Sequence, residues 1–277
     1  MSSLVIKSIG TALNATSLIS SKYASKKALN LFASPRKGRY NEVQLKTLEQ
    51  ADYNLLKYEN HTIATYHFEG NSKTILLAHG WESNASRWSY LFEDLIAEDY
   101  NIILLDGPAH GKSGGKQFNA VLYSEFINVV AETYKPEALI GHSVGGMASV
   151  FCMHNHQLDF VKKLVLLGAP AHFTGVFTRY KSMMGYNHRI SEGLDRIVLE
   201  RFGKPTDYFS AANFTKDIEA EGLIIHDKKD KIIPYEDALL FANRYKNAEL
   251  ITTTGYGHSL KDKSITPSII NFLNKKK

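Results

Sequence analysis

The chain of 277 residues contains a single cysteine, Cys152, so it cannot form an intramolecular disulfide. The fold therefore does not depend on an oxidising compartment, and we expect a cytoplasmic protein. Long apolar runs are also lacking: the charge-free stretch over residues 8–21 is rich in Ser, Thr and Asn, and is too short and polar to span a membrane. A secretory signal has little support, because Lys7 follows an apolar triplet instead of preceding an apolar run.

Acidic residues are absent from residues 1–41, which carry seven Lys and Arg and hence a charge of +7. The whole chain has 33 Lys and Arg against 28 Asp and Glu, so residues 42–277 have a charge of −2. The pI near 9.0 thus describes a basic N-terminal arm on a nearly neutral body. This distribution argues against a domain that binds nucleic acid over its whole surface.

Apolar side chains of the arm fall on one side of a helical wheel, which Lys27 and Ser20 interrupt: Val5, Ile9, Ala12, Leu13, Tyr23, Ala24 and Leu31. A basic, weakly amphipathic helix of this kind can lie on an anionic membrane surface. It can equally pack on the nearly neutral body, help cover a pocket or be partly disordered. Peripheral membrane contact through residues 1–41 is therefore one of several expectations for the arm.

Short strand-like runs alternate with helical segments from about residue 55 onward. Residues 55–58 and 62–68 read as an antiparallel pair. Continuous apolar runs, which are typical of strands buried on both faces, follow at residues 74–78, 101–105, 138–140, 164–167, 222–226 and 249–253. Helical segments are expected around 86–97, 120–133, 144–156, 235–246 and 266–274. This order predicts a mostly parallel, doubly wound α/β sheet.

The alternation stops for about forty residues after Gly168-Ala169-Pro170, in a segment rich in Phe, Tyr, Met and Arg. The simplest interpretation is a small helical cap inserted between two strands of the sheet. We therefore expect an arm over residues 1–50, the first part of the core over 51–170, the cap over 171–214 and the second part of the core over 215–277.

Gly141-His142-Ser143-Val144-Gly145 stands between a buried strand and an apolar helix. This strand, turn and helix context predicts a nucleophile elbow, a sharp turn that presents the Ser143 hydroxyl above the sheet. The helix that begins at Val144 offers free backbone N–H groups and a positive dipole end to an oxyanion.

A serine hydroxyl needs a base to take its proton and an acid to orient that base. His258 lies in a glycine-containing loop after the last strand, at the sheet edge where open α/β sheets bind ligands. Asp227 and Asp230 follow the preceding strand, and we choose Asp230 because it lies further along the loop and can reach the histidine. The order Ser143, Asp230, His258 is the order of nucleophile-elbow hydrolases.

These motifs together resemble the α/β-hydrolase fold of serine hydrolases of the esterase and lipase type, over about residues 55–275. His79-Gly80-Trp81 resembles the family's His-Gly loop, and the likeness implies an oxyanion hole formed by the backbone amides of Trp81 and Val144. Residues 106–113 resemble the family's D-x-x-G-H-G-x-S turn, except that Ala109 replaces a glycine. The pattern from Asp230 to Pro234 resembles the family's D-x-x-[VI]-P segment.

The resemblance implies hydrolysis of a small-molecule carboxylic ester through an acyl-enzyme on Ser143. The same three residues would serve a thioesterase, a carbon–carbon bond hydrolase, an aminopeptidase or an acyltransferase, and the fold can also serve as a ligand-binding protein without catalysis. The chain lacks H-E-x-x-H, G-x-G-x-x-G and Walker A patterns, so we expect no metal and no organic cofactor.

Substrate contacts are expected next to the serine and from the cap. The positions next to the serine are His79, Gly80 and His142. The cap positions are Phe173, Phe177, Met183 and Met184, whose apolar side chains can roof a pocket that favours hydrophobic acyl groups. Filling the small core of the cap itself is the alternative role of these cap residues.

Overall fold

The computed structural model describes residues 3–275 and divides into two compact units. The smaller unit is formed by residues up to Ser34 together with residues 172–210, and the larger one by residues 35–171 and the chain from Ala211. The boundaries expected from the sequence lie elsewhere, after residues 50, 170 and 214. The arm up to Ser34 and the inserted residues 172–210 thus belong to one unit, although 137 residues of the other unit separate them in the chain. Residues 35–50 of the expected arm belong to the larger unit.

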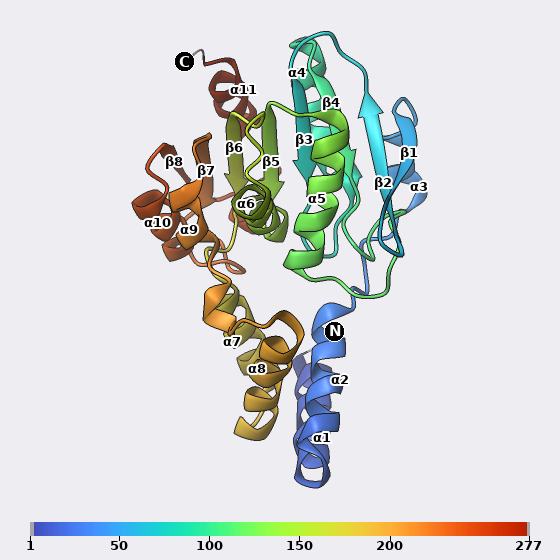
Figure 1. The fold of residues 1–277 in the computed structure, drawn as a ribbon, viewed down its shortest axis with the longest axis vertical. Helices are drawn as coiled ribbons and strands as arrows, with labels where there is room; N and C mark the ends of the chain where they lie inside the picture. Colours follow the sequence, from blue (N-terminus) through green and yellow to red (C-terminus); the bar gives the residue numbers. More distant parts are fainter. Residues whose placement is uncertain (1–2, 276–277) are drawn as a thin grey trace. The chain divides into compact units, whose positions relative to one another are not determined.

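An eight-stranded sheet forms the centre of the larger unit, in the order β1-β2-β4-β3-β5-β6-β7-β8 (Figure 1). β1 pairs antiparallel with β2, and β2 pairs antiparallel with β4, whereas the remaining pairs are parallel. The predicted hairpin and the predicted mostly parallel α/β sheet are therefore confirmed. The strands are β1 (Asp52–Tyr58), β2 (His61–Phe68), β3 (Thr74–Ala78), β4 (Asn101–Leu105), β5 (Ala138–His142), β6 (Lys163–Leu167), β7 (Glu221–Asp227) and β8 (Ala248–Thr253).

Helices cover both faces of this sheet, which is why its central strands carry almost no exposed side chains. α5 and α6 pack against each other on the near face in Figure 1, and α4 packs with α11. The helices are α3 (Glu42–Lys46), α4 (Ser89–Ala97), α5 (Ala120–Tyr134), α6 (Val144–His156), α9 (Ala211–Phe214), α10 (Tyr235–Arg244) and α11 (Thr266–Asn274). Trp88, Leu95 and Phe272 join strand residues such as Ile75 and Ile140 in one buried core.

The turn after β4 is built around the carboxylate of Asp106, which is fully buried. Asp106 accepts hydrogen bonds from the Tyr40 and Tyr66 hydroxyls at 2.7 and 3.0 Å and from the Lys112 N–H at 2.8 Å. Ala109, which stands where the resembling family has glycine, adopts a φ of +63° in this turn. The left-handed region is unfavourable for alanine, so the substitution leaves the turn intact but strained.

Ala109→Gly is expected to raise the free energy of unfolding by about 1 kcal/mol, because relief of the left-handed strain exceeds the added entropy of the unfolded chain. Urea unfolding followed by circular dichroism measures the change. Ala131→Gly in the buried part of α5 is the matched control and should destabilise the protein by about 1 kcal/mol or more. Equal losses for both variants would show that Ala109 is not strained.

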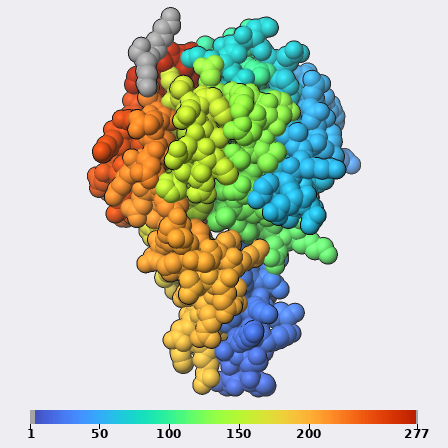
Figure 2. Space-filling model, viewed as in Figure 1, coloured from blue at the N-terminus to red at the C-terminus, as the bar shows by residue number. Residues whose placement is uncertain are grey.

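The smaller unit is formed by helices α1 (Ser3–Ile19), α2 (Ser21–Ala33), α7 (Phe173–Met184) and α8 (His188–Phe202). α2 packs against α8, and α1 packs against α2 and α7. Figure 2 shows the blue atoms of the arm directly against the amber atoms of the inserted segment. An aromatic cluster joins the two segments, since the Phe32 ring lies 5.2 Å from that of Phe177 and 4.8 Å from that of Tyr180.

The arm forms two helices instead of the single helix that the sequence suggested. Ser20 has an extended φ of −148°, and its hydroxyl accepts a hydrogen bond from the Tyr23 N–H, so it ends the first helix and caps the second. Both helices pack against the inserted helices α7 and α8, which are partners that the sequence analysis did not name for the arm. Within residues 3–275, no helix is both long enough and apolar enough to cross a membrane.

Candidate active site

Ser143 lies in the turn between β5 and α6, with a φ of +52° and a ψ of −127°. A non-glycine residue keeps such a backbone only where its surroundings enforce it. Here the Ser143 N–H donates to the Leu167 carbonyl at 2.8 Å. Gly145 lets α6 approach β3 closely, since a Cβ on Gly145 would lie 2.4 Å from the Ala78 and His79 carbonyl oxygens. The turn therefore places the Ser143 side chain at the carboxyl edge of the parallel strands.

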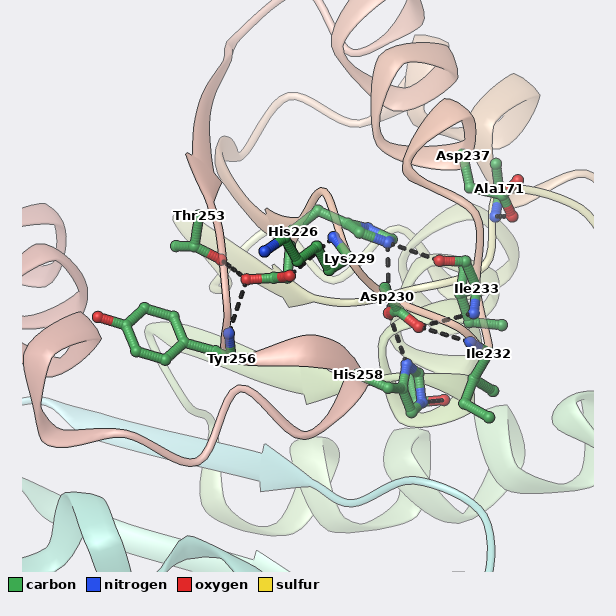
Figure 3. A network of polar contacts seen from close by, with 12 residues as sticks. Ala171, His226, Lys229, Asp230, Ile232, Ile233, Asp237, Thr253, Tyr256 and His258 are labelled. Atoms are coloured by element: carbon green, nitrogen blue, oxygen red, sulfur yellow. Dashed lines mark hydrogen bonds and ion pairs between the residues drawn. The ribbon is translucent and has the colours of Figure 1, made fainter.

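Ser143 and His258 come from distant parts of the chain and meet at this edge. The Ser143 Oγ lies 3.0 Å from His258 Nε2. On the other side of the ring, His258 Nδ1 lies 2.7 Å from Asp230 Oδ2 (Figure 3). Since an ionised carboxylate only accepts hydrogen bonds, Nδ1 carries the proton and Nε2 is free to accept from the hydroxyl. The structure thus brings together the three residues that the sequence predicts as catalytic.

Several donors surround the Asp230 carboxylate, whose side chain is fully buried. Its Oδ1 accepts from the backbone N–H groups of Ile232 and Ile233 at 2.8 and 2.9 Å. Burial opposes ionisation, but hydrogen bonds from His226, His258 and Ile233 hold the pKa of the Asp230 carboxyl well below its usual range. Asp230 is therefore a fixed negative charge behind the His258 ring.

His226 is a further neighbour of Asp230 that the sequence did not single out. Its Nε2 donates to the Ile233 carbonyl at 3.0 Å and lies 3.4 Å from Asp230 Oδ2 (Figure 3). The His226 ring is fully buried at the end of β7, four residues before Asp230. The feature of the sequence that could have identified His226 is its position at the end of a buried strand, just before the loop that contains Asp227 and Asp230.

Asp227 has a different set of contacts and does not reach the His258 ring. Its Oδ2 accepts from the Thr253 hydroxyl and from the Tyr256 N–H, both at 2.9 Å, and its Oδ1 accepts from the Lys229 N–H at 2.8 Å (Figure 3). These bonds tie the end of β7 to the loop that carries His258. Of the two candidate acids in the sequence, Asp230 is thus the one that contacts the His258 ring.

The loop after β3 approaches Ser143 through Gly80. A Cβ on Gly80 would lie 3.0 Å from the Ser143 Cβ and 2.8 Å from His142 Nδ1, so only glycine fits here. Trp81 follows Gly80 directly, and Val144 follows Ser143. Among the hydrogen bonds described for residues 3–275, none is donated by the Trp81 or Val144 N–H, so the protein itself uses neither of the two predicted donors.

The side chain of His79 does not face a substrate, contrary to the expectation from the sequence. It is fully buried, its Nδ1 bonds the Gly80 carbonyl at 2.7 Å, and its Nε2 accepts from the Gly107 N–H at 2.9 Å. Burial lowers the pKa of His79 to about 4, so the ring is neutral. His79 therefore links the loops after β3 and β4 and has no exposed atom to offer a ligand.

His142 and Arg87 hold the main chain around His258. His142 Nε2 bonds the His258 carbonyl at 2.9 Å, and Arg87 Nη2 donates to the Ser259 carbonyl at 2.6 Å. Arg87 is 5% exposed and also lies 5.4 Å from the Trp88 ring. The sequence assigned His142 to substrate contact and did not single out Arg87, because a lone arginine beside a tryptophan carries no motif.

The four predicted cap positions lie in the smaller unit and differ in exposure. Phe177 and Met184 are buried in that unit, the Phe173 ring stacks on Phe177 at 4.8 Å, and Met183 is 52% exposed. Phe177 and Met184 thus fill the core of the helical unit itself. Substrate contact by these cap residues stays a prediction.

A cavity of about 290 Å³ in the larger unit lies at the opposite edge of the sheet, where the strands begin. Its lining includes Lys73, Glu137, Lys163 and Glu221. The Lys163 ammonium donates to the carbonyls of Phe272, Leu273 and Lys275 and so caps the end of α11. This cavity is separate from Ser143.

Within residues 3–275, no group of three or more His, Cys, Asp or Glu side chains is arranged to hold a metal ion.

Comparisons with known proteins agree with this architecture. Residues 75–260 match the Alpha/beta hydrolase family. The chain is 30% identical over 141 residues to the pimeloyl-[acyl-carrier protein] methyl ester esterase of Salmonella newport, which covers 48% of this chain and 52% of that protein. It is 23% identical to the AB hydrolase superfamily protein YisY of Bacillus subtilis, over 73% of this chain and 91% of that protein. The chain spans about half the length, or less, of the first curated relatives that it matches.

Solved structures share the same fold. Est1E from Butyrivibrio proteoclasticus, with ferulic acid bound, superposes with a TM-score of 0.66 at 17% identity, over 80% of this chain and all of that one. The matched family region contains Ser143, Asp230 and His258, together with the sheet edge at which they meet. The chain therefore belongs to the alpha/beta hydrolase family.

Proposed function

We propose that the chain is a serine hydrolase that cleaves carboxylic esters through an acyl-enzyme on Ser143. The observation that carries this proposal is the unbroken line of contacts from Ser143 Oγ to His258 Nε2 and from His258 Nδ1 to Asp230 Oδ2. The strained backbone of Ser143 supports the same role, since strain of this kind is retained at functional sites. The names of relatives, among them a methyl ester esterase, favour an ester as the bond attacked.

In the first half of the reaction, Ser143 Oγ attacks the carbonyl carbon while His258 Nε2 takes the hydroxyl proton. The His258 ring becomes an imidazolium, which the Asp230 carboxylate stabilises through its bond to Nδ1. The carbonyl oxygen becomes an oxyanion, and the backbone N–H groups of Trp81 and Val144 are the proposed donors to it. His258 then gives its proton to the departing alcohol as the carbon–oxygen bond breaks.

In the second half, His258 Nε2 takes a proton from water, and the resulting nucleophile attacks the acyl carbon. The second tetrahedral intermediate collapses when His258 returns the proton to Ser143 Oγ. A carboxylic acid leaves, and the starting hydrogen-bond pattern is restored. Each step uses only protein side chains, backbone N–H groups and water.

The experiment that tests this proposal measures the rates at which the protein hydrolyses p-nitrophenyl esters of increasing chain length, matched thioesters and aminoacyl p-nitroanilides. We expect a burst of nitrophenol stoichiometric with the protein, because acylation precedes a slower deacylation. The esters should turn over faster than the anilides, since an anilide nitrogen leaves only after His258 protonates it. Turnover of thioesters or anilides alone would reassign the bond, and no turnover of any substrate would favour a ligand-binding protein.

A further inference from the structure

The smaller unit carries an unusual combination of charge and exposed apolar residues at one end. The side chain of Asn14 donates to the Gly185 carbonyl at 2.8 Å and accepts from the Asn187 N–H at 2.9 Å. The side-chain NH₂ group of Asn187 also donates to the Ser17 hydroxyl at 2.9 Å. These bonds place the turn between α7 and α8 beside the last turns of α1. Residues 17–23 and 183–189 therefore form one end of the unit, which we call the tip.

Large apolar side chains at the tip face solvent. Ile19 is 92% exposed and Leu18 is 70% exposed, and they stand next to each other where α1 ends at Ser20. Tyr23 and Met183 are 54% and 52% exposed. Adjacent exposed apolar residues of this size on a helical turn mark an interaction site.

Positive charge surrounds these residues. Lys22 and Arg189 belong to the tip, and Lys26 lies one turn further along α2, and all three are exposed. The tip contains no Asp or Glu, and the whole smaller unit has ten Lys and Arg against four Asp and Glu, a net charge of +6. One of the four acids, Asp195, is already paired with Lys181 at 2.7 Å.

We propose that the tip docks on the surface of a bilayer that contains anionic lipids. Leu18 and Ile19 enter the boundary between headgroups and acyl chains, while Lys22, Lys26 and Arg189 contact lipid phosphates. A lipid surface fits better than an acidic protein, because Leu18 and Ile19 are strongly exposed in the last turn of α1 and a bilayer accepts such side chains without a matching groove. This role goes beyond ester hydrolysis and does not depend on it.

The test uses the full chain and vesicles of phosphatidylcholine, either alone or mixed with phosphatidylglycerol. Co-sedimentation should be strong only with the mixed vesicles and should weaken towards about 1 M salt, where the Debye length falls to about 3 Å. Each of Lys22→Gln and Lys26→Gln should weaken binding about fivefold. Leu18→Ser combined with Ile19→Ser should weaken it on the order of tenfold or more.

The matched control combines Val43→Ser and Ile96→Ser, which remove similarly exposed apolar side chains from the larger unit. Both double variants alter solvent-exposed residues, so each should keep the native circular dichroism spectrum. In addition, Leu18→Trp should show a blue-shifted emission when mixed vesicles are added, whereas the native tryptophans Trp81 and Trp88 should not respond. Equal vesicle binding by the tip variant and the native chain would overturn the proposal. The proposal would also be wrong if the native protein did not bind either kind of vesicle but did bind an acidic protein.

Discussion

Ser143→Ala is expected to reduce ester turnover by about six orders of magnitude and to abolish labelling by a fluorophosphonate probe. The reason is that Ser143 Oγ is the atom that lies 3.0 Å from His258 Nε2 and is the proposed acyl acceptor. Without it, only binding and the oxyanion donors can accelerate the reaction, which leaves about 10³–10⁴-fold over water. Gel detection of the probe and release of nitrophenol from an ester measure the two losses.

Ser259→Ala is the matched control for this loss. Ser259 is exposed and follows His258 directly, and it is the backbone carbonyl of Ser259, which the substitution keeps, that accepts from Arg87. The control should retain labelling and most of the turnover. A fluorophosphonate label that persists in Ser143→Ala, on protein with a native circular dichroism spectrum, would show that another residue reacts.

Asp230→Asn is expected to lower kcat by about 10⁴-fold while substrate binding changes little. An asparagine can turn its amide NH₂ towards His258 Nδ1, which must then become the acceptor. The proton moves to Nε2, and that nitrogen can no longer accept from the Ser143 hydroxyl. Steady-state kinetics with a p-nitrophenyl ester separate the effect on kcat from the effect on KM.

Asp227→Asn should give the contrasting result. The Asp227 carboxylate accepts hydrogen bonds from backbone N–H groups and a hydroxyl that fix the loop before His258. In the variant, the NH₂ group of the asparagine would point at one of these donors, and that hydrogen bond would be lost. We expect a loss of about 1–3 kcal/mol in the free energy of unfolding and a much smaller loss of kcat than in Asp230→Asn. The reverse ranking of kcat would assign the acid role to Asp227.

Local sequence patterns predicted the sheet well, because buried parallel strands require continuous apolar runs. β3 and β4 begin and end at the predicted residues, while β5 extends two residues further to His142. The extension contains Gly141 and His142, which carry little strand preference on their own. Pairing with Leu166 and Leu167 of β6 keeps these two residues extended.

Short motifs likewise predicted the three residues that meet at the sheet edge, but not the contacts behind them. The choice of Asp230 over Asp227 rested on loop length and on a resemblance, whereas the 2.7 Å distance to His258 depends on the folded loop. Arg87 was missed because its partner is a backbone carbonyl. A carbonyl is present at every residue, so no side-chain pattern in the sequence identifies which one is used.

The arm is the part where local reasoning failed. A helical wheel over residues 5–31 treats the arm as one rod, but the Ser20 cap divides it into α1 and α2. Its partners α7 and α8 lie far along the chain, and the aromatic contacts of α7 with Phe32 follow no local periodicity. Such pairing depends on the shape of side chains that only the folded chain brings together.

The sequence by itself determined the α/β architecture, the serine turn and the candidate residues Ser143, Asp230 and His258. These features are local: a buried strand must be apolar, a sharp turn needs small neighbours, and loops at the ends of parallel strands meet at one edge. Only the tertiary structure decided that His79 is buried and that the basic arm joins the inserted helices. Those outcomes depend on contacts between residues distant in the chain, whose energies arise from packing and not from local preference.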